Sequence, residues 1–274
     1  MRVGLVQLNG SDDPDANLAQ TIDLISKAAH DGAAFVLTPE VTNIIGASRA
    51  QQDAVLSYED DDVTLAALRS QAVDLEIWIL IGSLALKTDD VDGRFANRSF
   101  LIDPKGTIRG RYDKIHMFDV HVSDEESYKE SLNYRSGDTI SVINMDAVNL
   151  GMSICYDIRF PHLYRDLALA GADLIAVPAA MSTITGPAHI ETLLRARAIE
   201  TGCYMLMPSQ TGDHGTRSTW GHSMIVSPWG EVLFDMGTDA GFRCLDLDID
   251  AVKEARAKIP SLYNNPSYQS PKNA

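Results

Sequence analysis

The sequence contains no apolar run long enough to cross a membrane, and its opening segment enters strand-like sequence directly, without the pattern of a signal peptide. We therefore expect a cytoplasmic protein that is not embedded in a membrane. Basic residues are few, with 23 Lys and Arg against 38 Asp and Glu, and the formal net charge is −15. That balance argues against a nucleic-acid partner or an anionic membrane surface, since both require a basic patch.

Metal-binding and disulfide patterns are also absent. The cysteines Cys155, Cys203 and Cys244 are odd in number and show no CxxC spacing, which argues against a disulfide framework and a structural zinc site. The seven histidines form no HxH or HxxxH pair. We predict neither a metal nor a cofactor.

What the 274 residues do contain is an alternation of strand-like and helix-like segments. Apolar residues recur at helical spacing over residues 18–29, after the start signal Asp13-Pro14, and a short apolar run follows at 34–37. A second such unit covers 65–82, and a hairpin is expected at 95–112 around a turn at 103–106. Similar helices and strands are expected at 163–177, 189–207, 222–227, 232–234 and 242–248. The alternation predicts an α/β fold.

The most informative segment, residues 151–161, ends an apolar strand at Cys155 and then turns into polar sequence. A thiol at the carboxyl end of a strand lies where α/β sheets bind ligands, and the following turn can aim an N–H group at an oxyanion. A single cysteine is more often buried and structural. Its interpretation as a nucleophile therefore depends on partners elsewhere in the chain.

Two other reactive side chains follow predicted strands in the same way. Glu40 comes just after the strand at 34–37, and Lys114 comes at the far end of the hairpin. A carboxylate to accept a thiol proton, a cation to stabilise an oxyanion and a sulfur nucleophile together suit covalent hydrolysis. Taken alone, Glu40 and Lys114 are each more simply interpreted as charged side chains exposed to solvent.

Other nucleophile arrangements fit the sequence less well. The segments 151–155 and 221–225 each begin like a serine nucleophile elbow but lack its closing glycine. A papain-like pair of Cys155 with His116, His162 or His189 is open on residue types alone, although no cysteine-protease signature surrounds the thiol.

Three ordered segments carry a family resemblance, namely Thr38-Pro39-Glu40, Tyr112-Asp113-Lys114-Ile115-His116 and Ser153-Ile154-Cys155-Tyr156-Asp157-Ile158-Arg159-Phe160-Pro161. They resemble the signature blocks of the nitrilase, or carbon-nitrogen hydrolase, superfamily. Agreement continues through 177–180, 185–189, 194–200, 221–223 and 228–230, and so covers nearly the whole chain up to about residue 250. The resemblance implies a four-layer α-β-β-α sandwich.

The resemblance also implies a site. It makes Glu40 the general base, Lys114 the partner of the oxyanion and leaving group, Cys155 the nucleophile and the Tyr156 backbone N–H an oxyanion donor. Glu130 matches the family's second glutamate, which would orient Lys114 and the substrate. If the loop is shifted in register, Glu125 or Glu126 takes that place.

Within the superfamily, the segments 184–189 and 193–201 look most like the branch that contains deaminated glutathione amidase and ω-amidase. The likeness implies hydrolysis of the terminal carboxamide of a small carboxylated substrate, deaminated glutathione or an ω-amide such as α-ketoglutaramate, to acid and ammonia. Arg159 and Arg197 are then candidates for binding carboxylates, and Met181 and Thr185 for lining the pocket. Structural ion pairs are the alternative for both arginines.

Three function classes follow: an amidase, an N-carbamoyl-amino-acid hydrolase or nitrilase using the same residues, and a non-catalytic binding protein, which an intact Glu40, Lys114 and Cys155 disfavours. The sequence departs from the branch at Met181 and Ile190, where aromatic residues are usual. We assign residues 1–250 to the hydrolase domain and 251–274 to a C-terminal helix and extended tail that could contact another subunit. The resemblance implies a homodimer or higher homo-oligomer.

Overall fold

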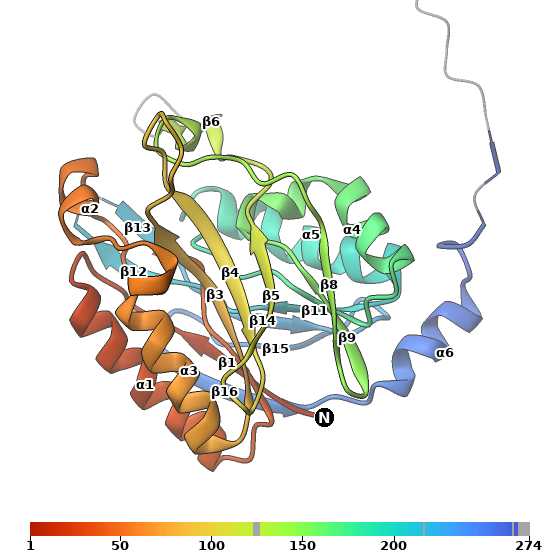
Figure 1. Cartoon of the computed structure of the whole chain (residues 1–274). Helices are drawn as coiled ribbons and strands as arrows, with labels where there is room; N and C mark the ends of the chain where they lie inside the picture. Colours follow the sequence, from red (N-terminus) through yellow and green to blue (C-terminus); the bar gives the residue numbers. More distant parts are fainter. Residues whose placement is uncertain (123–126, 216, 265, 268–274) are drawn as a thin grey trace, which may run out of the picture.

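The computed structural model describes residues 1–122, 127–215, 217–264 and 266–267. Two six-stranded sheets form its centre, as Figure 1 shows. The first sheet has the order β16(Gly241–Asp246), β1(Arg2–Gln7), β2(Phe35–Leu37), β3(Trp78–Leu86), β4(Ala96–Ile102) and β5(Ile108–Asp113). The second has the order β15(Val232–Asp235), β14(Met224–Val226), β11(Tyr204–Met207), β10(Leu174–Ala176), β9(Val148–Met152) and β8(Ser141–Met145).

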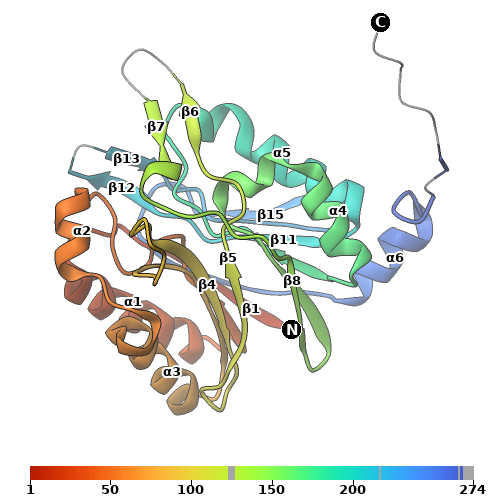
Figure 2. The same ribbon diagram turned by 45° about the horizontal axis from the view of Figure 1, so that its top comes forward.

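Helices cover the outer faces of both sheets (Figures 1 and 2). On the first sheet, α1(Pro14–His30) and α3(Val63–Leu75) pack against strand residues such as Val6 and Ile79. On the second sheet lie α4(Pro161–Leu169) and α5(Thr185–Thr201). Between the sheets, side chains such as Leu5 and Leu37 meet Leu150 and Met152 in one buried cluster. The layers confirm the predicted four-layer α-β-β-α sandwich.

Shorter elements lie around these layers. Two hairpins form two-stranded sheets of their own, namely β6(Asp119–His121)–β7(Ser127–Lys129) and β12(Thr211–His214)–β13(Arg217–Trp220). Thr219 of β13 also forms a single bridge to Ser182. The chain also forms α2(Arg49–Val55), α6(Asp250–Lys258) and the 3-10 turns η1(Glu59–Asp61), η2(Glu130–Leu132) and η3(Cys155–Arg159). Part of the C-terminal tail, residues 265 and 268–274, lies outside the described residues.

Most of the predicted helices and strands are confirmed. The helix after Asp13 is α1, and Asp13 caps it by accepting from the N–H groups of Asp15 and Ala16. The predicted hairpin is β4–β5, which pair antiparallel. The strand expected from His222 begins at Met224, because His222 adopts a positive φ of 56° that no strand accommodates.

The topology explains why reactive groups gather at one edge. Strands β1, β2 and β3 run parallel, and β5 runs the same way because two antiparallel pairings separate it from β3. In the second sheet β9, β10 and β11 are parallel. The segments that follow β2, β5 and β9 therefore begin at the carboxyl ends of these strands, which is where α/β folds bind ligands.

Candidate active site

Glu40 follows β2 and is 5% exposed. The Thr38 hydroxyl accepts from the N–H of Gly82 at 3.0 Å, which holds the segment before Glu40 against β3. From the second sheet's side of the molecule, the Gln210 amide donates to the Glu40 carbonyl at 3.0 Å. The carboxylate is thus fixed from both halves of the fold.

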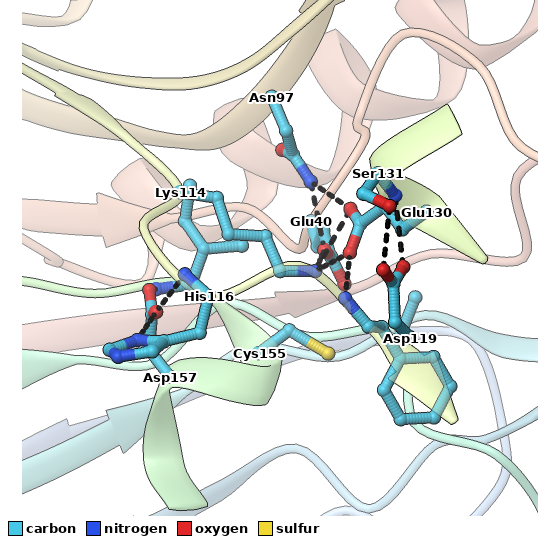
Figure 3. Close-up of polar contacts among 12 residues, drawn as sticks. Glu40, Asn97, Lys114, His116, Asp119, Glu130, Ser131, Cys155 and Asp157 are labelled. Atoms are coloured by element: carbon cyan, nitrogen blue, oxygen red, sulfur yellow. Dashed lines mark hydrogen bonds and ion pairs between the residues drawn. The ribbon is translucent and has the colours of Figure 1, made fainter. Parts of the chain in front are cut away.

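Lys114 follows β5 directly and is 2% exposed. Its Nζ donates to Glu40 Oε1 at 2.9 Å and to Glu130 Oε1 and Oε2 at 3.0 and 2.9 Å, as Figure 3 shows. Asn97 Nδ2 adds a donor to Glu40 at 3.0 Å and to Glu130 at 3.4 Å. One ammonium group and one amide therefore join the two carboxylates.

Glu130 opens η2, and its Oε2 also accepts from the backbone N–H of Phe118 at 2.7 Å. The next residue, Ser131, is tied to Asp119, which fixes η2 against β6. These contacts place Glu130 where the sequence predicts the second glutamate. The alternatives, Glu125 and Glu126, lie outside the described residues.

Cys155 is the first residue of η3 and is 8% exposed. It adopts a positive φ of 50°, a strained conformation for a residue other than glycine, and its N–H donates to the Pro178 carbonyl at 2.9 Å. The sharp turn brings the thiol beside the Glu40–Lys114–Glu130 cluster (Figure 3). Its Sγ also lies 3.9 Å from Met181 Sδ.

Asp157, two residues after the thiol, fastens this turn to the lysine segment. Its fully buried carboxylate accepts from the Tyr112 hydroxyl at 2.7 Å, the His116 N–H at 3.0 Å and the Ile154 N–H at 2.9 Å. Tyr112 and His116 flank Lys114 by two residues on each side. Asp157 therefore fixes Lys114 and Cys155 relative to each other.

The charges of the cluster decide the protonation states. Burial alone would raise the pKa of Glu40, but the Lys114 ammonium and hydrogen bonds from Lys114 and Cys155 hold it below its ordinary value of 4.5. Burial would lower the pKa of Lys114, yet the charges of Glu130 and Glu40 raise it well above 10.5. Burial and the Glu40 charge raise the pKa of the Cys155 thiol. The resting site thus combines an ionised base with a neutral thiol.

A cavity of about 360 Å³ opens onto this cluster. Glu40, Lys114, Glu130, Cys155, Tyr156, Arg159, Met181 and Thr185 all line it. Arg197, the other predicted carboxylate ligand, does not line it. Arg197 is buried, donates to the Ile158 carbonyl at 2.8 Å and pairs with Glu200 at 2.9 Å, so it has the structural role that the sequence left as the alternative.

The histidines considered as bases are engaged elsewhere. His116 Nδ1 lies 2.7 Å from Asp157, and its ring stacks on Phe160. His189 Nδ1 lies 3.3 Å from an Arg159 nitrogen. Neither these two nor His162 lines the cavity, which disfavours a papain-like pair.

Sequence reasoning missed Asn97, Asp157 and Arg217 as site residues. Arg217, on β13, lines the cavity. Asp157 stood inside a signature block, which could have marked it, whereas Asn97 and Arg217 carry no local signal. Among the described residues, no group of three or more His, Cys, Asp or Glu side chains could hold a metal, and no helix is both long and apolar enough to cross a membrane.

Comparisons with known proteins show which family the chain is similar to. A family model described as carbon-nitrogen hydrolase matches residues 2–257. The deaminated glutathione amidase of Yersinia enterocolitica is 37% identical over 265 residues, which cover 96% of this chain and 92% of that protein.

Two solved structures are similar throughout this chain. The C. elegans NitFhit protein has a TM-score of 0.89 at 31% identity, over 96% of this chain and 64% of that one. An amidase from Nesterenkonia sp. AN1 has a TM-score of 0.78 at 27% identity, over 96% and 99% of the two chains. The latter was solved with acrylamide added to its active-site cysteine.

Proposed function

Because the chain belongs to the carbon-nitrogen hydrolase family and is a hydrolase of C–N bonds, we propose that it is a thiol-dependent amidase for small carboxylated amides. One observation carries the proposal: the Lys114 ammonium bridges Glu40 and Glu130 at about hydrogen-bond length beside the buried Cys155 thiol. Base, cation and nucleophile therefore line the same cavity.

The first step transfers a proton. Glu40 is ionised and the thiol is neutral, so the carboxylate accepts the thiol proton as sulfur attacks the amide carbon. The negative charge then moves from sulfur to the carbonyl oxygen. The buried site favours proton transfer coupled to attack, because burial raises the pKa of the Cys155 thiol and so makes a free thiolate costly.

The tetrahedral oxyanion needs donors. Lys114 Nζ is one, and the Tyr156 N–H is the other, because the first N–H groups of a helical turn have no partner inside it and Tyr156 is the second residue of η3. Glu130 accepts from the same ammonium with both carboxylate oxygens and so holds it in position for the oxyanion.

Collapse of the intermediate breaks the C–N bond. The protonated Glu40 gives its proton to the leaving amine, and a Cys155 thioester remains. Water, deprotonated by Glu40, then attacks the thioester, which releases the acid and returns the proton to sulfur. Ammonia leaves from a primary carboxamide. Deaminated glutathione, in which the amide nitrogen belongs to a peptide, would instead release a peptide amine.

The carboxylated substrate class is supported by the cavity and by the relatives. Arg159 lines the cavity, and its guanidinium can bind a carboxylate in two-point fashion. Relatives named deaminated glutathione amidase match 96% and 90% of the chain. The predicted homo-oligomer and the cytoplasmic location stay proposals.

The test is a screen for amine and acid release from deaminated glutathione, α-ketoglutaramate, N-carbamoyl-β-alanine and simple nitriles. Cys155→Ala is the blank, and Cys244→Ala, which removes a partly buried thiol far along the chain, is the matched control. We expect turnover of a carboxylated amide that Cys155→Ala abolishes and Cys244→Ala keeps. Turnover by Cys155→Ala at the parent rate would refute the mechanism. Exclusive turnover of the carbamoyl compound, with carbon dioxide released, or of nitriles would replace the amide assignment.

A further inference from the structure

Two arginines line the active-site cavity and form no ion pair with a carboxylate among the described residues. Arg159 comes from η3 and Arg217 from β13, and both line the cavity. Among the described residues, the Arg159 guanidinium contacts His189 Nδ1, and the Arg217 guanidinium donates to the Ala180 carbonyl. The cavity carboxylates, Glu40 and Glu130, are already engaged by Lys114.

Arg217 is the less satisfied of the two. It is half-buried, its Nη2 donates to Ala180 at 2.7 Å, and its Nε has no hydrogen-bond partner in the described part of the chain. The charge of Arg217 helps to lower the pKa of Glu40, but Glu40 is hydrogen-bonded to Lys114, and no carboxylate of the described residues forms an ion pair with Arg217. A partly buried guanidinium without a directly paired counter-ion is costly. An anionic ligand in the cavity would supply that counter-ion.

An aromatic row separates the two guanidinium groups. Arg217 lies over the Tyr128 ring at 5.6 Å, and Arg159 lies over the Tyr156 ring at 5.9 Å. Phe118 stands between these rings, with centroid distances of 5.1 Å to each. Each arginine therefore lies over a different ring of this row, and we infer from this that they mark two positions on the cavity wall.

We propose that Arg217 binds a substrate carboxylate at a position distinct from Arg159, so that the favoured substrate is an amide with two separated carboxylates. The inference rests on the proposed amidase function and narrows its substrate class. A cavity of about 360 Å³ has room for such a molecule, because ligand sites are typically about 300–1,000 Å³.

A purely structural role for Arg217 makes a different prediction. By holding the Ala180 carbonyl, Arg217 could fix the loop whose Ala180 backbone contacts the Cys155 thiol. Loss of that support would slow every substrate by the same factor. A carboxylate-binding role would slow only substrates that carry the matching carboxylate, so the readout must be a ratio between substrates.

Four related amides provide this ratio: N-glutarylglycine with two carboxylates, glutaramate with one on the acyl side, N-butanoylglycine with one on the amine side, and butanamide with none. The quantity to compare is the ratio of kcat/KM between amides with and without a given carboxylate. For one of the two carboxylates, we expect Arg217→Gln to lower this ratio about 10- to 100-fold, which is the effect of losing a charged hydrogen bond. Arg217→Lys should restore part of that preference. Arg159→Gln should reduce the preference for the other carboxylate. The matched control is Arg195→Gln, an exposed arginine of α5.

Equal losses on all four amides would overturn the inference and leave the amidase function intact. If the parent enzyme cleaves none of them, calorimetric titration of Cys155→Ala with N-glutarylglycine decides. Binding that weakens at least about tenfold when Arg217→Gln is added supports the inference even though the amidase proposal fails. Binding that is absent, or unchanged by Arg217→Gln, overturns it.

Discussion

At the residue scale, Lys114 carries the electrostatics of the site. Two carboxylates, Glu40 and Glu130, lie within 3.0 Å of its ammonium, and Lys114 itself is 2% exposed. Like charges buried together would otherwise force one carboxyl to keep its proton. The cation therefore keeps Glu40 ionised as a base and also supplies the charge that the oxyanion needs.

Replacing this cation should change the pH profile as well as the rate. In the parent protein the pKa of Glu40 lies below 4.5, so the acid limb of kcat/KM should lie below pH 4.5. In Lys114→Met the carboxyl pKa rises, and the acid limb should move above that value while turnover falls about 10²–10³-fold. Lys129→Met, which removes an exposed lysine at the cavity rim, should keep the acid limb of the parent.

Circular dichroism would confirm that both variants are folded before their profiles are compared, because breaking a buried ion pair can cost about 3–5 kcal/mol. A folded Lys114→Met protein with an unmoved acid limb would mean that Lys114 does not control the ionisation of Glu40.

The residues of the site were unequally predictable from the sequence. Glu40, Lys114 and Cys155 each follow a strand, which made a shared site conceivable, and the resemblance to the nitrilase superfamily then assigned their roles. Arg197 was predicted as a substrate ligand but is turned toward the Ile158 carbonyl. Which way a side chain of a helix faces depends on packing that no local pattern specifies.

At the element scale, the site depends on how closely β3 approaches the segment before Glu40. A Cβ atom at Gly82 would lie 2.0 Å from the Thr38 carbonyl oxygen and 2.5 Å from that of Pro39. It would also lie 2.6 Å from Pro178 Cβ, in the loop that accepts the Cys155 N–H. Gly82 therefore permits a close approach at the point where both catalytic segments meet.

We expect Gly82→Ala to lower activity far more than its effect on stability alone would. The added methyl must displace backbone on both sides, which typically costs about 1–3 kcal/mol and here moves Glu40 away from Cys155. Gly241→Ala, at the start of β16 where a Cβ would meet nothing within 4 Å, is the matched control. Urea unfolding and kcat measure the two effects, and a fully active Gly82→Ala enzyme would contradict the expectation.

Element prediction succeeded where apolar patterns were strong. The buried runs of β3 and β11 and the periodic face of α1 were all expected. The hairpins β6–β7 and β12–β13 were missed because their strands are short, largely polar and lie outside the two six-stranded sheets. These hairpins supply Tyr128 and Arg217 to the cavity wall, so the least predictable elements hold the residues that we link to substrate choice.

At the scale of the whole molecule, neither sheet contains a complete site. Glu40 and Lys114 follow strands of the first sheet, whereas Cys155 follows a strand of the second. Gln210 joins the two halves: its fully buried amide donates to the Glu40 carbonyl at 3.0 Å and accepts from the Gly10 N–H at 3.2 Å. Catalysis therefore requires the two sheets to be docked.

Weakening this connection should remove activity and structure together. Gln210→Met leaves the Gly10 N–H and the Glu40 carbonyl buried without partners, at a cost of about 1–3 kcal/mol for each unsatisfied group. In urea, we expect its amidase activity and its far-ultraviolet circular dichroism to be lost in one transition at a lower midpoint than in the parent protein. Gln20→Met makes the same chemical change on the outer helix α1 and should leave the midpoint near that of the parent. The parent protein could instead lose activity at a much lower urea concentration than its dichroism. That result would mean that the two sheets separate without unfolding, and that the interface between them is less stable than either sheet.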